Sequence, residues 1–341
     1  MKGKHFLITG HTGFKGAWLA ALLGQTGATV SGIALNPAPN SIFIKAGIQE
    51  FLDHDIRQDI RDADQTRKFI QAISPDVVFH LAAQPLVLSS YDTPKETFET
   101  NVNGTLNVLE AISSVSTIQA TVIVTTDKVY QQNEGKVAFS ENDPLGAADP
   151  YSTSKAMADL LTQSWIKSNP HLSIGIARAG NVIGGGDVAV NRLIPDLIRA
   201  FGSNVVAQVR NPSAVRPWQH VLDCLNGYIR LAEYLVSGSD KSSAFNFGPD
   251  SESPLEVSEV ANLAALSWGE SASWKATSEP QPTEAAFLTL DSFKAKTVLG
   301  WSDKLPTSDS IGWTVEWEKR VARGESAWDV TSEQILRFLQ K

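Results

Sequence analysis

Cysteine and basic residues are both scarce in this 341-residue sequence. Its one cysteine, Cys224, excludes a disulfide within the chain and a cysteine-rich metal site, and we expect it to be a small buried apolar side chain. The chain has only 29 lysines and arginines against 37 aspartates and glutamates, so its net charge is -8. This balance argues against a general nucleic-acid-binding protein, but it allows a local basic pocket for a phosphorylated ligand. We expect no metal site.

Long apolar runs are also missing. No stretch reaches the roughly 18 apolar residues that a membrane-spanning helix needs. The N-terminal MKGKHFLITG enters a strand at once, without the apolar core of a signal peptide, so we expect a cytoplasmic protein. Hydrophobic residues make up 42% of the chain and charged residues 19%, which is typical of a compact globular protein.

Apolar strands alternate with helical patterns through the first half of the chain. Such alternation predicts an α/β fold with a Rossmann-type, doubly wound parallel sheet, helices on both faces and right-handed crossovers. The predicted strands are 5–9, 29–35, 76–81, 120–125 and 172–178, and the predicted helices are 14–25, 62–73, 94–113 and 150–167.

The alternation breaks after about residue 180. Glycines and prolines then separate shorter elements, and seven of the nine tryptophans lie beyond this point. We therefore expect a dinucleotide-binding domain formed by 1–178 and roughly 218–243. A smaller, mixed substrate lobe would comprise 179–217 and 244–341 and end in a helix over 313–338.

The segment FLITGHTGFKG, residues 6–16, places Gly10, Gly13 and Gly16 directly after a strand and at the start of a helix. Glycine lets the backbone turn sharply and approach a pyrophosphate, and the helix N-terminus offers free N–H groups to anionic oxygens. The motif predicts a dinucleotide-binding loop, in which Thr12, Phe14 and Lys15 would also take part.

The choice between NAD and NADP stays open at this point. An acidic residue about 20 positions further on would bind the adenosine ribose and mark NAD. The second strand instead ends in IALNPAPN, with neither an acid nor an arginine, although Lys15 could hold the 2′-phosphate of NADP. Asp59 and Ile60, after a later short apolar step, could line an adenine pocket or form a solvated loop.

Two further segments carry candidate acid–base residues. In PYSTSKAMADLL, residues 150–161, Tyr151 and Lys155 are four positions apart and would share one helix face. An ammonium there favours the phenolate and would lower the pKa of the tyrosine, as a general base requires. In TVIVTTDKVY, residues 121–130, a buried strand ends in Thr125, Thr126, Asp127 and Lys128, a block of hydroxyls, acid and base.

Together with HLAAQ at 80–84 and NVNGT at 101–105, these motifs make the chain resemble the extended short-chain dehydrogenases/reductases over roughly residues 5–318. The closer resemblance is to the CDP-glucose 4,6-dehydratases. It rests on GHTGFKGAWL, TTDKVYQQNE, DPLGAADPYSTSK, RAGNVIGGGD and VRNPSAVRPWQHV.

The resemblance implies a hydro-lyase that uses tightly retained NAD to turn CDP-glucose into CDP-4-keto-6-deoxyglucose. Tyr151, helped by Thr126, would take the proton of the 4-hydroxyl during its oxidation. Lys128 would then remove the C5 proton, and Asp127 would protonate the departing 6-hydroxyl. Lys128 stands where the dTDP- and GDP-sugar branches have a glutamate, so its pKa would have to be lowered by its surroundings.

The resemblance also implies contacts for cofactor and substrate. The cofactor contacts would be Gly10, Thr12, Gly13, Phe14, Lys15, Gly16, Asp59, Ile60, Leu81, Ala82, Ala83, Asn101, Thr125, Tyr151 and Lys155. Gln84 would touch the sugar or stabilise its loop, and Asn181 would lie near the diphosphate. Arginine suits bidentate contact with phosphate, so Arg192, Arg210 and Arg216 would hold the diphosphate.

Two segments depart from the CDP-glucose pattern. QQNEGKVAFSENDP, residues 131–144, lacks the expected Trp and Tyr, and Val188 replaces an expected aromatic residue. The alternatives are a UDP-sugar dehydratase, a 4-epimerase and a non-enzymatic nucleotide sensor. The pair Asp127–Lys128 argues against an epimerase, which eliminates no water. Many relatives pair their helices corresponding to 94–113 and 150–167, so we expect a homodimer.

Overall fold

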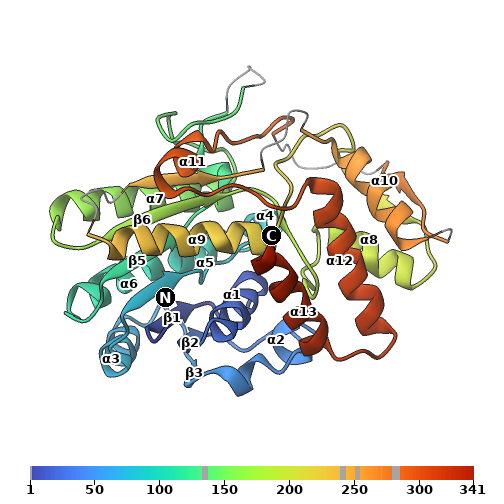
Figure 1. Cartoon of the computed structure of the whole chain (residues 1–341). Coiled ribbons are helices and arrows are strands. Elements are labelled where there is room, and N and C mark those ends of the chain that lie inside the picture. Colours follow the sequence, from blue (N-terminus) through green and yellow to red (C-terminus); the bar gives the residue numbers. More distant parts are fainter. Residues whose placement is uncertain (1, 133–136, 239–242, 250–253, 270, 279–284) are drawn as a thin grey trace.

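A parallel sheet of seven strands forms the centre of the molecule (Figure 1). The computed structural model describes residues 2–132, 137–238, 243–249, 254–269, 271–278 and 285–341. The strand order is β10-β6-β5-β4-β1-β2-β3, so the direction of winding reverses between β1 and β4. In such sheets ligands bind outside the carboxyl ends of the strands at this reversal. The predicted Rossmann-type fold is thereby confirmed. The strands are β1 (His5–Thr9), β2 (Thr29–Ala34), β3 (His54–Arg57), β4 (Val77–His80), β5 (Ala120–Val124), β6 (Ile174–Ala179) and β10 (Ala244–Phe247).

Helices cover both faces of this sheet. In β1, Phe6 and Ile8 join the apolar core on one face, while Leu7 between them joins the core on the other, as the two-residue period of a strand requires. The first face is covered by α1 (Phe14–Gln25), α9 (Val221–Val236), α11 (Phe293–Leu299) and α13 (Ala327–Gln340). The second is covered by α3 (Ala63–Ile73), α6 (Gly104–Ser113) and α7 (Pro150–Ser168).

A second, smaller core lies at one end of the molecule, where α8 (Leu193–Gly202) and α10 (Val257–Trp268) pack side by side with α12 (Thr307–Ala322) (Figure 1). Leu197, Val260 and Ile311 meet there. The short strands β8 (Ala207–Val209) and β11 (Trp274–Ala276) pair beside these helices, and β7 (Val182–Ile183) pairs with β9 (Gln219–His220). Within the described residues, no helix is long and apolar enough to cross a membrane.

Three details differ from the sequence-based expectations. Ala244–Phe247 was assigned to the smaller lobe, but it pairs with β6 as an edge strand of the central sheet. The expected helix over 313–338 is two helices, because Gly324 has a φ of +93° between α12 and α13. The expected helix over 94–113 is interrupted by the π-helical turn η2 (Glu99–Asn103), between α5 (Pro94–Phe98) and α6. The remaining short helices are α2 (Ile42–Lys45), η1 (Ile48–Phe51), α4 (Val87–Asp92) and η3 (Asp127–Val129).

Candidate active site

The glycine loop after β1 has the geometry that a dinucleotide needs. Gly10 has a φ of +79°, and a Cβ there would lie 2.7 Å from the backbone nitrogen of Ala82. A Cβ on Gly16 would lie 2.2 Å from the carbonyl oxygen of Gly10, so only glycine lets α1 start so close to the loop. Gly13 is the N-cap of α1, and no side chain caps this helix. Its first N–H groups therefore remain available for a pyrophosphate, and the loop fits NAD.

Lys15 does not lie where the sequence-based alternative needed it. Its Nζ is 3.2 Å from the Tyr228 hydroxyl, and its side chain lines the cavity that also contains Tyr151 and Lys128. Burial lowers the pKa of the Lys15 ammonium. This lysine therefore faces the reaction centre rather than the adenosine ribose, so it offers no site for the 2′-phosphate of NADP. The Thr12 hydroxyl donates to the Leu35 carbonyl and fixes the loop against the end of β2.

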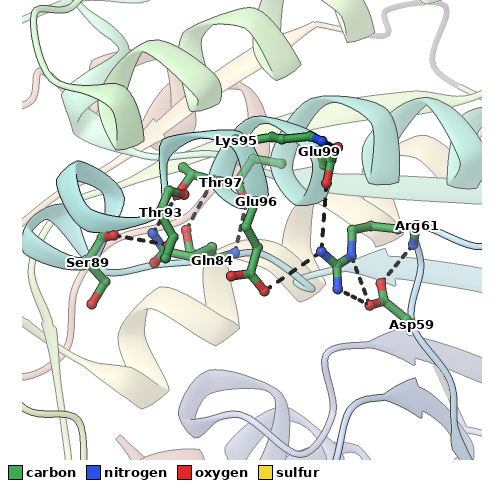
Figure 2. A network of polar contacts seen from close by, with 10 residues as sticks. Asp59, Arg61, Gln84, Ser89, Thr93, Lys95, Glu96, Thr97 and Glu99 are labelled. Carbon is green, nitrogen blue, oxygen red and sulfur yellow. Dashed lines mark hydrogen bonds and ion pairs between the residues drawn. The ribbon is translucent and has the colours of Figure 1, made fainter.

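Asp59 and Ile60 follow β3, the edge strand of the sheet next to β2. Arg61 donates to the Asp59 carboxylate through Nε at 2.9 Å and Nη2 at 2.6 Å. It also forms ion pairs with Glu96 and Glu99 of the neighbouring helical segment (Figure 2). The Arg61 contacts lower the pKa of the Asp59 carboxyl although burial opposes them. Ile60 is buried against Gly104, so only its backbone could reach a cofactor.

The Gln84 side chain is hydrogen-bonded within its own loop and is absent from the lining of the cavity that contains Tyr151 and Lys128. Its Nε2 donates to Thr97 Oγ1 at 2.9 Å (Figure 2) and to the Leu86 carbonyl at 3.1 Å. Its Oε1 accepts from the Leu86 N–H. Asn101 is buried beside it, accepts from the Gln84 N–H and donates to Ser154. Asn101 thus ties the loop after β4 to α7.

The preceding part of that loop lies beside the glycine loop. The Leu81 N–H donates to the Thr9 carbonyl, and the Ala82 N–H donates to the Thr9 hydroxyl at 3.3 Å. Leu81, Ala82 and Ala83 are all partly exposed. They are therefore placed at the carboxyl ends of β1 and β4, where the winding of the sheet reverses and a dinucleotide is expected.

Thr126, Asp127 and Lys128 follow β5, with Thr126 as the N-cap of the short helix η3 that contains Asp127 and Lys128. The Thr126 hydroxyl donates to Asp127 Oδ1 at 2.9 Å, and Lys128 Nζ lies 3.1 Å from the same oxygen. Lys128 also donates to Asn181 Oδ1 at 3.3 Å. Asp127 is fully buried, and its Oδ2 has no hydrogen-bond partner among the described residues. A buried acceptor without a partner is costly, so this carboxylate retains an unused acceptor beside Thr126 and Lys128, which line the cavity.

Tyr151 and Lys155 lie one turn apart in the first part of α7, which begins with Asp149 as its N-cap and Pro150 in its first turn. Burial raises the pKa of Tyr151 to about 12, and a hydrogen bond to Thr126 opposes this rise. Burial lowers the pKa of Lys155 to about 7, and the nearby Lys15 acts in the same direction. Lys155 Nζ donates to the Val124 carbonyl at 2.7 Å. The expected lowering of the Tyr151 pKa by Lys155 is therefore not seen in this structure.

One cavity joins the reaction centre to the smaller lobe. Arg210 Nη2 donates to the Asn191 carbonyl at 2.7 Å, and its Nη1 is buried without a partner among the described residues. Arg192 is held by Asp187 at 2.8 Å, and Arg216 is 6% exposed. The predicted residues on this cavity are Phe14, Lys15, Thr125, Thr126, Lys128, Tyr151, Asn181, Arg192, Arg210 and Arg216.

Sequence analysis missed the residues that orient these arginines. Asp187 accepts from Arg192, and the Asn191 carbonyl accepts from Arg210. An acid five residues before Arg192 was the one signal that could have indicated the first pair. Pro85, Leu86 and Val87 form a further wall of the cavity that no motif predicted. Of the unusual segment 131–144, residues 133–136 lie outside the described part of the chain.

The parallel sheet, the glycine loop and the Tyr151–Lys155 pair define a dinucleotide-dependent enzyme of the short-chain dehydrogenase/reductase type. The chain belongs to the NAD dependent epimerase/dehydratase family, whose profile matches residues 6–248. NAD is the cofactor of that family, in agreement with the fit of the glycine loop and the position of Lys15.

Individual relatives agree with this assignment. The chain is 42% identical to the CDP-glucose 4,6-dehydratase of Salmonella typhimurium, over 99% of this chain and 97% of the relative. It is 28% identical to a probable dTDP-glucose 4,6-dehydratase of Sinorhizobium fredii, over 91% of each. Among solved structures, a UDP-glucose-4-epimerase from Stenotrophomonas maltophila with bound NAD superposes with a TM-score of 0.83 and 21% identity, covering 94% of this chain and 99% of that one. At this identity the likeness shows the shared fold.

Proposed function

We propose that this chain is a CDP-glucose 4,6-dehydratase, which converts CDP-glucose into CDP-4-keto-6-deoxyglucose and water. The observation that carries the proposal is the convergence of Thr126, Lys128 and Tyr151 on one cavity that three arginines also line, with the buried Asp127 carboxylate bonded to both Thr126 and Lys128. The 42% identity to a CDP-glucose 4,6-dehydratase over nearly the whole chain supports the same reaction.

The side chains divide the proton transfers among them. Tyr151, within reach of the Thr126 hydroxyl, takes the proton of the sugar 4-hydroxyl as C4 is oxidised to a ketone. The ketone acidifies C5, so that Lys128 can remove the C5 proton. Asp127 gives a proton to the 6-hydroxyl, which leaves as water and produces a C5–C6 double bond. NAD, when bound, would accept hydride from C4 and return it to C6, so the reaction has no net redox change. Lys128 would return a proton to C5 at that stage, which completes the 4-keto-6-deoxy sugar.

Burial of Tyr151 works against its role as a base, because the phenolate is costly in an apolar site. Positive charge must offset this cost, and Arg192 already acts in that direction. Lys155 lies one turn along the helix and donates to the Val124 carbonyl, and in its protonated form it adds a second cation beside the same site. Arg192, Arg210 and Arg216 would bind the diphosphate, because guanidinium groups suit bidentate contact with phosphate oxygens.

The deciding experiment is incubation of the purified protein with CDP-glucose and NAD⁺, followed by the alkaline absorbance of a 4-keto-6-deoxy sugar. UDP-glucose, UDP-N-acetylglucosamine and dTDP-glucose are run in parallel. Product from CDP-glucose alone supports the proposal. Product from a UDP-sugar alone would retain the chemistry and change the substrate, and an epimer that keeps its 6-hydroxyl would contradict the dehydratase assignment.

We also propose that the protein is a homodimer that packs α5–α6 and α7 against the same helices of a second copy. The support is an apolar strip on the outside of α7, where Met157 is 44% exposed and Leu160, three residues on, is 51% exposed. Light scattering of the parent chain should give twice the chain mass, and Leu160→Arg should give the monomer mass. A monomeric parent at micromolar concentration would contradict the proposal.

A further inference from the structure

A buried ion pair lies directly behind the reaction centre. Arg178 on β6 donates through Nε to Asp159 Oδ2 and through Nη2 to Asp159 Oδ1, both at 2.8 Å. The exposed fraction is 1% for Arg178 and 0% for Asp159. Removing two charges from water costs several kcal/mol per ion, and apolar residues of similar volume often give equal or greater stability. Stability alone is therefore a poor explanation for this pair.

Both partners contact the ends of the acid–base segment, Thr125–Tyr130. Asp159 lies one turn after Lys155 on α7, and its Oδ2 accepts from the Thr125 hydroxyl at 3.0 Å. Arg178 Nη1 donates to the Tyr130 hydroxyl at 2.9 Å. The pair thus holds the segment at its first and last residues, with Thr126, Asp127 and Lys128 between them.

The contacts at Tyr130 continue into the edge of the sheet. Its hydroxyl donates to Asn246 Oδ1 at 2.6 Å, and Asn246 Nδ2 donates to the Phe139 carbonyl at 2.8 Å. The ring of Tyr130 stacks on Phe139 with 4.9 Å between centroids. Tyr130 and Asn246 are fully buried, so this chain of hydrogen bonds does not compete with water.

We propose that Asp159 and Arg178 are positioning residues that hold Asp127 and Lys128 in place relative to Tyr151 and Lys155. The inference rests on the proposed function, in which oxidation at C4 uses Tyr151 and Thr126 whereas water elimination uses Asp127 and Lys128. The Tyr130 end of the segment is two residues from Lys128 and four from Thr126. Loosening that end should therefore slow elimination more than oxidation.

Tyr130→Phe tests this directly, because it removes one hydroxyl and keeps the stacked ring. Single turnovers with CDP-glucose separate the two stages: the absorbance of reduced nicotinamide reports C4 oxidation, and quenched product reports elimination. We expect elimination to slow by about tenfold, the value of a buried hydrogen bond lost at this stage, and oxidation to change less than about twofold. Reduced nicotinamide should then accumulate in the variant.

Matched variants complete the test. Tyr234→Phe removes a tyrosine hydroxyl from α9 and should leave both rates unchanged. Arg178→Lys keeps the charge but loses the two-pronged contact. It should slow both stages, because Tyr130 loses its guanidinium donor and Asp159, the partner of Thr125, is no longer held at both oxygens. Equal effects of Tyr130→Phe on the two stages, or no effect on either, would overturn the inference. Wild-type protein run alongside separates the two failures, since a wild type that eliminates no water contradicts the proposed function instead.

Discussion

Lys128 Nζ lies 3.1 Å from Asp127 Oδ1, while the Oδ2 of the same buried carboxylate has no partner among the described residues. One oxygen is thus engaged by the cation, and the other keeps an unused acceptor position directly behind Thr126 and Lys128, which line the cavity. This arrangement lets adjacent residues act on adjacent sugar carbons, with the amine at C5 and the carboxyl at the C6 hydroxyl. The two residues would therefore carry out different proton transfers, and neither could perform the transfer of the other.

Replacing either residue should stop the reaction after its first stage. We expect Lys128→Met and Asp127→Asn each to lower kcat for the dehydrated product by about 10²- to 10⁴-fold, the usual value of a general acid or base. C4 oxidation should continue, so that reduced nicotinamide becomes visible on mixing with CDP-glucose. Lys68→Met, an exposed change on α3, is the control. Normal elimination by Lys128→Met would show that another group removes the C5 proton.

Lys155 gives a pH dependence of stability. Burial lowers its pKa in the folded protein to about 7, from the ordinary lysine value of 10.5. Between these values the unfolded chain binds a proton that the folded chain does not, so this group makes the free energy of unfolding rise with pH. Below about pH 7 the full cost of burying the charge is present. The free energy of unfolding of Lys155→Met, minus that of the parent, should therefore fall between pH 7 and pH 10 in urea titrations. A constant difference would contradict the lowered pKa.

Two glycines of α1 provide a matched test of the cofactor loop. Gly16→Ala places a methyl group 2.2 Å from the Gly10 carbonyl oxygen, so the loop must shift, and both stability and NAD affinity should fall. Gly24→Ala, in the same helix, meets no atom within 4 Å and should raise the free energy of unfolding by about 0.5–1 kcal/mol. Thermal unfolding with and without NAD measures both effects. Equal melting temperatures for the two variants would contradict the close approach at Gly16.

Replacing Gln84 distinguishes a side chain that stabilises its own loop from one that binds the substrate. Gln84→Ala removes the hydrogen bonds to Thr97 and Leu86, and we expect a loss of about 1–3 kcal/mol in the free energy of unfolding. The KM for the nucleotide sugar should stay within about twofold, because no ground-state contact is lost. A large rise in KM at unchanged stability would restore the substrate contact that the sequence suggested.

The sequence predicted the features that depend on local patterns. The glycine loop, the strands before it and after it, and the helix over 14–25 follow from short-range rules of turn and periodicity. The arginines of the smaller lobe could be anticipated from their charge in a chain that is otherwise acidic. By contrast, β3 escaped prediction because HDIR is polar and partly exposed, the pattern of an edge strand rather than a core strand.

Side-chain direction was the harder problem. The glycine loop fixes the position of Lys15 in the chain but not the direction of its side chain. The ammonium lies beside the Tyr228 hydroxyl rather than toward the expected ribose. The Asp159–Arg178 pair joins residues of a helix and a strand, and no periodicity within either element indicates the contact. Long-range partners of this kind become visible only when the sheet is assembled.

The place of β10 has a consequence for the order of events on the ribosome. The last strand of the sheet emerges about 65 residues after β6, which at 5–20 residues per second is a delay of roughly 3–13 s. Until Ala244–Phe247 has been synthesised, β6 remains an unpaired edge and Tyr130 has no Asn246 to contact. The nascent chain can therefore complete its glycine loop well before its acid–base segment. The nucleotide site would then form before the acid–base residues reach their final positions.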